Sequence, residues 1–281
     1  GFLIEHGPST INAAVDEVRV LSENLGLDPS VVPLSDDVKR RFLVKDGALQ
    51  GVAAHPLGFF TSSYLSPAAR LRMLLEPLIS KGSPDTAESV EAWFSRRFGG
   101  EFARRVMDPL VGGLYAGRAD ELSLQSVFPR LLDMERQHGS IIRAALSHRL
   151  RGGVMPGKRL YSWTEGIGTL PTALSTGLTD CIHTGVTVRR ITGQQGGYQI
   201  DTAGHGRIAT RSILIATQPH VATAFLENVA PDGAEAIAAI DAPPLAVVFL
   251  GYRRADVDHP MDGLGYLSPR CENRALTGAQ F

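Results

Sequence analysis

The order of apolar and polar positions in the first third of the chain predicts mixed α and β structure. Residues 1–5 are an apolar run that stops at Gly7 and Pro8, as expected of a short strand. Apolar positions then recur near helical spacing over about residues 11–25, and Gly26 follows as a helix stop. The opening therefore reads as strand, turn and helix.

A block of helices is predicted from about residue 56 to residue 150. Ser66 can cap a helix whose first turn holds Pro67. Further helices are expected through residues 90–98 and about 101–110, and the last stretch is helical with an interruption at Pro129. The apolar positions of the first helix are Leu71, Leu74, Leu75 and Leu78.

Strand patterns return after residue 160. A turn and short helix over 166–178 precede three or four short strands with glycine turns; an apolar strand, a turn at Pro219 and a helix follow. The run 243–254 predicts another strand. We therefore assign an α+β or α/β fold in which a helical insert interrupts the framework, with ligands expected at the junctions.

Composition excludes several classes of function. The net charge is -1, so no global field recruits nucleic acid, and we expect no nucleic-acid partner. Two cysteines cannot build a cysteine-based zinc site, and the histidines lack ligand spacing, so no metal is expected. The sequence holds no apolar run long enough to cross a bilayer as a helix, no nucleophilic triad and no G-x-G-x-x-G.

Arg41 is the first candidate for chemistry. It opens an apolar stretch ahead of Asp46-Gly47, a pair that favours a hairpin turn. A planar guanidinium on a strand is a good anchor for a carboxylate, although a solvated arginine at a sheet edge is the alternative.

Two glycine-rich segments are the other candidates. In residues 108–124 the helical pattern breaks at Gly112-Gly113, which predicts either an ordinary loop or bare backbone that a flat ligand can approach closely. In the run 262–270, Gly263 and Gly265 predict close approach of a ligand or of another backbone, or a strand with a bulge. A large flat apolar ligand that carries carboxylates would suit both segments and Arg41.

The central run of the chain resembles the oxygen-dependent protoporphyrinogen oxidases. Their pattern EPLxxGxYAGDPxxLSxxxxFPxLxxLExxxGS is matched nearly throughout by residues 108–140, in DPLVGGLYAGRADELSLQSVFPRLLDMERQHGS. The segments GPSTINAAVDEVRVLSENLGL, KRRFLVKDGAL, LPTALSTGL, GVTVRRI and ILIATQPHVATAFL resemble further parts of that family. The wider flavin amine oxidase superfamily lacks the central run.

The resemblance implies a flavoenzyme that oxidises protoporphyrinogen IX to protoporphyrin IX, with FAD as cofactor and molecular oxygen as acceptor. It implies a two-domain flavin oxidase framework with an inserted helical domain. Residues 49–158 would be the helical membrane-associating and substrate domain, whereas 1–48 and 159–281 would supply the FAD-domain and substrate-domain framework. The expected location is cytoplasmic and peripheral to a bacterial inner membrane, or on an organellar membrane, and a homodimer is among the expected assemblies.

The resemblance also implies roles for individual residues. Arg41 would pair with a propionate of the tetrapyrrole. Leu264, Gly265, Leu267 and Gly113 would line the tetrapyrrole pocket. Gly7 and Pro8 would lie beside the isoalloxazine of FAD, and the backbone of Val188 would meet its adenine. No catalytic residue is assigned.

The sequence departs from the family where the phosphates of FAD are held. The glycine-rich nucleotide fingerprint and the C-terminal flavin segment are missing, so we expect a part of a longer protein that binds FAD poorly and is inactive alone. Coproporphyrinogen III oxidation, another flavin oxidase and a non-catalytic tetrapyrrole-binding module remain the alternatives.

Overall fold

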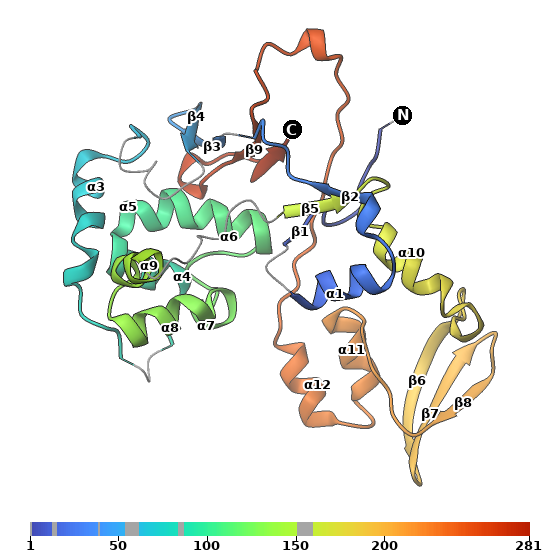
Figure 1. Cartoon of the computed structure of the whole chain (residues 1–281). Coiled ribbons are helices and arrows are strands. Elements are labelled where there is room, and N and C mark those ends of the chain that lie inside the picture. Colours follow the sequence, from blue (N-terminus) through green and yellow to red (C-terminus); the bar gives the residue numbers. More distant parts are fainter. Residues whose placement is uncertain (1, 13–15, 39, 54–61, 84–86, 151–159) are drawn as a thin grey trace. The chain divides into compact units, whose positions relative to one another are not determined.

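The computed structural model describes residues 2–12, 16–38, 40–53, 62–83, 87–150 and 160–281 (Figure 1). The chain divides into two compact units, and each is described by itself. Unit 1 comprises Gly1–Ile167 and Val248–Phe281, and unit 2 comprises Gly168–Val247. The three-part division expected from the sequence stays a prediction.

A four-stranded sheet in unit 1 carries Arg41. Its order is β10-β9-β3-β4, with β3 parallel to β9 and antiparallel to β4. Asp46 and Gly47 both have positive φ, 51° and 79°, and join β3 to β4 in the hairpin turn predicted for this pair. The strands are β3 (Arg40–Lys45), β4 (Ala48–Ala53), β9 (Gly263–Leu267) and β10 (Gly278–Gln280).

A smaller sheet of unit 1 has the order β1-β5-β2. Its strands are β1 (Ile11–Asn12), β2 (Val31–Pro33) and β5 (Leu160–Trp163). The helix α1 (Asp16–Asn24) ends before Gly26, which has φ +68° and acts as the predicted stop. The helix expected from Ile11 is wrong at its start, because Ile11 and Asn12 pair with β5; residues 13–15 lie outside the described part.

The predicted helical block is present in unit 1 (Figure 1). Ser66 accepts the backbone N–H of Ala69 through its hydroxyl at 3.1 Å, as predicted for a cap. The helices are α3 (Pro67–Leu74), the 3-10 turn η2 (Glu76–Leu78), α4 (Val90–Phe98), α5 (Gly100–Phe102), the π-helix η3 (Ala103–Met107), α6 (Asp108–Tyr115), α7 (Leu124–Val127), α8 (Pro129–His138) and α9 (Ile141–Leu150).

The expected helix break at Gly112-Gly113 is wrong. Helix α6 continues through both glycines to Tyr115 and ends at Ala116, which takes the left-handed conformation with φ 52°. Burial of Val111 in the core offsets the weak helix propensity of glycine. The feature that sequence missed is the π-helix just before α6, a form often found near functional sites.

The core of unit 1 joins the helical block to the four-stranded sheet. Buried aromatic and aliphatic side chains from α4 and η3 pack with Leu43 of β3 and Val52 of β4. The rings of Trp93 and Phe94 meet edge to face at 4.8 Å between centroids. The sheet face that holds Leu43 and Val52 is therefore the face turned toward the helices.

The leucines of α3 and η2 do not join this core. Leu71, Leu74 and Leu78 are each more than half exposed, and Leu75 is 43% exposed; α3 buries only Met73. The leucine stripe, defined as these four leucines, therefore follows helical spacing but faces away from the packed interior.

Unit 2 holds a three-stranded antiparallel sheet, ordered β6-β7-β8, and three helices in its described residues. The turn and short helix predicted for 166–178, the glycine-linked strands and the helix after Pro219 are all confirmed. The elements are α10 (Thr169–Thr176), the 3-10 turn η4 (Thr179–Cys181), β6 (Thr187–Gln194), β7 (Gly197–Ala203), β8 (Arg207–Thr210), α11 (Pro219–Leu226) and α12 (Pro231–Ala238).

Three predicted strands do not form. Residues 2–5, 212–217 and 243–253 take no strand pairing within the described part of the chain. Their apolar side chains are exposed, as at Phe2 (83%) and Leu214 (93%). A strand needs a hydrogen-bonded neighbour, and apolar runs of this kind are typical of strands buried inside a larger sheet.

Candidate functional site

Arg41 lies opposite a β-bulge in the neighbouring strand. On one side it pairs with Val52 of β4. On the other side Arg40 is opposite Gly263 and Phe42 is opposite Tyr266, so that Leu264 and Gly265 together face the single residue Arg41. The structure thus brings together three residues that the sequence placed at the site from segments far apart in the chain.

The bulge explains the glycines of β9. Gly265 has φ +143°, and a Cβ there would lie 2.1 Å from the carbonyl oxygen of Ala279 on β10. A Cβ at Gly263 would lie 2.7 Å from Cε2 of Phe42. Of the sequence-based interpretations, the bulged strand and the close approach of another backbone are therefore confirmed, while contact with a ligand stays a prediction.

The two remaining pocket candidates meet on the helix-facing side of this sheet. Because side chains alternate along a strand, Arg41 shares a face with Leu43, and Leu43 is opposite Leu267. A Cβ at Gly113 of α6 would lie 2.7 Å from Cδ2 of Leu267. Gly113 thus permits a close approach of helix and strand beside the face that bears Arg41.

The guanidinium of Arg41 is unpaired among the described residues around the bulge. Its neighbour Arg40 pairs with Asp262, with Nε and Oδ2 3.4 Å apart. Arg41 is exposed, and within the described ranges its side chain has no ion-pair or hydrogen-bond partner. An unpaired guanidinium beside apolar side chains is suited to receive a carboxylate.

Tyr64 connects the sheet to the π-helix and was missed by sequence reasoning. The buried hydroxyl lies 2.9 Å from the carbonyl oxygen of Arg105 and 3.3 Å from that of Val44 on β3. Burial raises the pKa of Tyr64 well above its usual range, so the hydroxyl stays protonated. It therefore donates a hydrogen bond to a carbonyl oxygen. Its contacts show that this tyrosine fixes the helix against the strand.

Charged residues after β9 make a second connection that sequence reasoning missed. Glu272 accepts the backbone N–H groups of Asp46 and Gly47, each at 3.1 Å, and pairs with Nη1 of Arg105 at 3.1 Å. Burial acts to raise the pKa of Glu272, but these hydrogen bonds and Arg105 outweigh it, so the pKa is lowered and the carboxylate stays ionised. Asp108 and Arg270 form a further pair there.

The flavin candidates lie in different units of the chain. Gly7 and Pro8 are exposed in unit 1, and a Cβ at Gly7 would meet no atom within 4 Å. Val188 lies on β6 in unit 2, opposite Thr202. The roles of these three residues toward FAD stay predictions.

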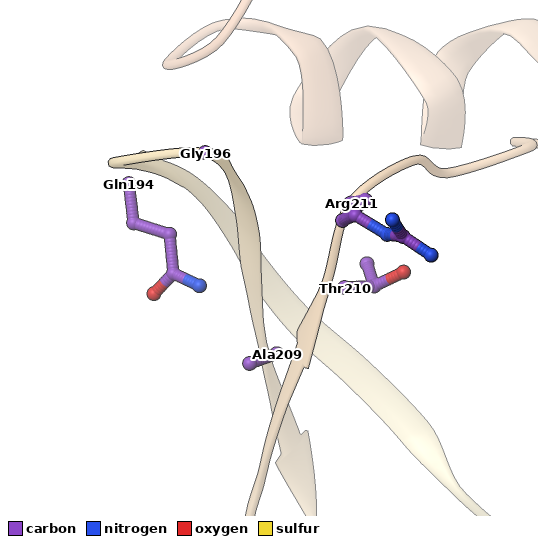
Figure 2. A pocket seen from close by; sticks show the side chains of 5 residues that line it. All are labelled: Gln194, Gly196, Ala209, Thr210 and Arg211. Carbon is purple, nitrogen blue, oxygen red and sulfur yellow. The ribbon is translucent and has the colours of Figure 1, made fainter.

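The described residues of unit 2 form a shallow hollow at the turn between β6 and β7 (Figure 2). Its volume is about 400 Å³. It is lined by Gln194, Gly196, Ala209, Thr210 and Arg211. None of these is a predicted site residue, and the lining offers one cation and no carboxylate.

No group of three or more His, Cys, Asp or Glu side chains in the ranges that the structure describes could hold a metal ion. Among the helices described, none combines the length and the apolar character that crossing a bilayer requires.

The curated proteins that the chain resembles include several named protoporphyrinogen oxidases. The chain is 32% identical over 309 residues to human "Protoporphyrinogen oxidase", with all of this chain and 62% of the relative covered. It is 29% identical over 312 residues to "Protoporphyrinogen oxidase 2, chloroplastic/mitochondrial" of Arabidopsis thaliana, covering 98% of this chain and 60% of the relative. The chain thus spans about three fifths of the length of these relatives.

Solved structures share the fold. A protoporphyrinogen oxidase described as putative, from Exiguobacterium sp. 255-15, matches with a TM-score of 0.71 at 18% identity, over 99% of this chain and 61% of that one. Cyclohexylamine oxidase from Brevibacterium oxydans matches with a TM-score of 0.54 at 19% identity, over 84% and 52%. These likenesses confirm the expected flavin oxidase framework of mixed helices and sheets.

The family itself follows from the whole length of the chain. The family model described as "Flavin containing amine oxidoreductase" matches residues 1–281. The chain therefore belongs to the family of flavin-containing amine oxidoreductases.

Proposed function

We propose that this chain forms the tetrapyrrole-binding part of a protoporphyrinogen oxidase. The overall reaction removes six electrons and six protons from protoporphyrinogen IX to give protoporphyrin IX. The names of the curated relatives support this choice within the family. The whole protein would catalyse this oxidation, with protoporphyrinogen IX as its substrate and molecular oxygen as the final electron acceptor.

The observation that carries the proposal is the position of Arg41. Arg41 pairs with the bulge formed by Leu264 and Gly265, and its exposed guanidinium has no partner among the described residues. A porphyrinogen is a large apolar ring with propionates at its edge. A carboxylate at Arg41 would form charge-assisted hydrogen bonds, which contribute roughly 1.5–3 kcal/mol each.

The surroundings of Arg41 suit the ring as well as its carboxylate. Leu264 and Leu267 lie on the same strand, and Gly113 allows α6 to approach that strand closely. Side chains of this kind bury an apolar ligand without competing hydrogen bonds. Arg41 would thus orient the substrate, while the leucines and the glycine would form the wall.

FAD would be the electron acceptor, and molecular oxygen would reoxidise it. The contribution proposed for this chain is to bind and orient the substrate. No residue is assigned as a general base.

The leucine stripe supports peripheral contact with a membrane. Its four leucines are exposed on α3, on η2 and at Leu75 between them. An exposed apolar helix face can insert partway into one leaflet without crossing it. We propose this stripe as the contact and place the protein at the surface of a membrane.

An assay on the complete protein that carries these residues tests the reaction. Added FAD and protoporphyrinogen IX should give a rise in porphyrin fluorescence that depends on oxygen. Coproporphyrinogen III, offered in parallel, tests the second substrate of the same class. Flavin binding without any fluorescence rise would reject the oxidase, and porphyrin binding without oxidation would indicate a non-catalytic binding module.

A further inference from the structure

An ion pair ties the helix that bears Gly113 to the strand that bears Leu267. Asp108 is the first residue of α6, and Arg270 follows shortly after β9. Oδ2 of Asp108 accepts the backbone N–H of Arg270 at 3.1 Å, and Oδ1 accepts Nε of Arg270 at 2.6 Å. One carboxylate thus holds both the backbone and the side chain of Arg270.

The burial of the Asp108 carboxylate makes the geometry of this pair specific. The side chain of Asp108 is 5% exposed, whereas that of Arg270 is 45% exposed. Two charge-assisted hydrogen bonds to a buried carboxylate fix orientation as well as distance. Nη2 of Arg270 also reaches Oδ1 of Asp120 at 3.1 Å, which links the strand end to the loop that follows α6.

A second tie comes from the same short segment. Glu272 receives the N–H groups of the β3–β4 turn and pairs with Arg105 of the π-helix. We call residues 268–273 the clasp segment. The clasp segment contacts the hairpin that carries Arg41. It also contacts η3 and α6, the helix that carries Gly113, so it joins both sides of the proposed site.

We infer that Asp108 and Arg270 are positioning residues of the proposed tetrapyrrole site. They hold α6 against the end of β9, and so keep Gly113 in contact with Leu267 beside Arg41. The identity of the ligand as a tetrapyrrole rests on the proposed function, whereas the positioning of α6 by this pair is independent of it. Neither residue is expected to touch the substrate.

Amide hydrogen exchange without ligand tests the positioning itself. Arg270→Gln removes the charge from a partly exposed residue and leaves Asp108 in place. Exchange of the amides of Gly113, Leu114 and Tyr115 should become at least about tenfold faster, because α6 then opens locally. Arg136→Gln is the matched control, since Arg136 forms an exposed pair with Asp133 on α8. Unchanged exchange in Arg270→Gln would overturn the inference.

Porphyrin titration tests what the positioning does for binding. Protoporphyrin IX fluorescence should give a Kd about 5- to 10-fold higher for Arg270→Gln and for Asp108→Asn, and the double variant should be little worse than either, as for residues that act as a pair. If Asp108→Asn does not fold, Arg270→Gln alone decides. An unchanged Kd in folded Arg270→Gln, or an equal change in Arg136→Gln, would refute the role in binding. If the unaltered protein binds no porphyrin, the proposed function fails, and hydrogen exchange still decides whether the pair positions α6.

Discussion

Gly112 and Gly113 are neighbours on α6 with different surroundings. A Cβ at Gly113 would lie 2.7 Å from Cδ2 of Leu267, whereas at Gly112 the nearest atom is the carbonyl oxygen of Gly117 at 3.7 Å. The sequence indicated that a neighbour comes close here. It could not show that the neighbour is a strand more than a hundred residues away, nor that the helix continues.

Substitution of each glycine by alanine separates the two positions. Gly113→Ala should push Leu267 aside and raise the Kd for protoporphyrin IX about tenfold, because overpacking typically costs about 1–3 kcal/mol. Gly112→Ala is the control, and it should leave the Kd unchanged and stabilise the helix by roughly 0.5–1 kcal/mol. Fluorescence titration and thermal unfolding measure both effects; equal Kd changes would speak against Gly113 as a wall residue.

At the scale of helices and strands, the sequence predicted turns and caps that depend on adjacent residues. It did not predict which distant strands pair. The Asp46-Gly47 turn and the Ser66 cap depend on adjacent residues, and both were predicted correctly. The strands expected at 2–5 and 243–254 depend on a neighbour that the described residues do not supply. Arg41 and the glycines of β9 were found by residue type, but the bulge that joins them depends on register.

The helical block contains a buried ionic network that the sequence pattern did not reveal. Glu76 and Arg97 pair with both side chains fully buried. Glu76 also accepts the hydroxyl of Ser140 at 2.5 Å and the N–H groups that open α9. The network joins η2, α4 and α9 through one carboxylate, which satisfies donors that would otherwise be buried without partners.

Removal of the Glu76 charge should strongly destabilise this block. Glu76→Gln leaves Arg97 buried with weaker compensation, and the free energy of unfolding should fall by about 3–5 kcal/mol. Glu121→Gln is the control, because Glu121 pairs with Arg118 at the surface, where such pairs contribute about 0–1 kcal/mol. Denaturant unfolding measures both; a loss below that of the control would show that Glu76 does not support the block.

Glu135 should make the stability of the helical block sensitive to acid. Burial acts to raise the pKa of Glu135, but hydrogen bonds from Arg96, from the indole of Trp93 and from the N–H of Gly82 outweigh it and lower the pKa. A carboxyl whose pKa is lowered on folding adds stability above its unfolded pKa, about 4.3, and this stability is lost as the pH falls through the folded pKa.

A comparison with Glu135→Gln isolates this contribution. Glu101 and Glu272 also have lowered pKa values and remain in both proteins, so the difference between the two proteins reports Glu135. The Tm difference should be large at pH 7 and should shrink as the pH falls below about 4. A Tm difference that stays constant from pH 7 to pH 3 would contradict the lowered pKa.

At the scale of the whole molecule, the leucine stripe is one of the apolar surfaces that the core of the described residues leaves uncovered. Its spacing predicts a helix with one apolar face, and the family resemblance implies that this helical domain associates with a membrane. The structure exposes these leucines, while Met73 between them is buried. Helical spacing alone could not distinguish a core face from a face that contacts a membrane.

Vesicle sedimentation tests the stripe on the whole protein. Replacement of Leu71, Leu74 and Leu78 by serine should reduce binding to phosphatidylcholine vesicles at least about tenfold, because each buried leucine contributes about 1.5–3 kcal/mol. The matched control replaces the exposed Leu174, Leu178 and Ile182 of unit 2 by serine. Equal binding by the two triple variants would rule out the stripe as the contact.

The most direct test of the proposed site is the affinity for protoporphyrin IX of the Arg41→Ala variant, measured by fluorescence titration. Arg40→Ala is the matched control, because Arg40 already pairs with Asp262. If Arg41 receives a propionate, its loss should raise the Kd about 10- to 100-fold, as expected for a charge-assisted hydrogen bond, while Arg40→Ala should change it less than about twofold. Equal Kd values for Arg41→Ala and the unaltered protein would contradict a tetrapyrrole site at this bulge.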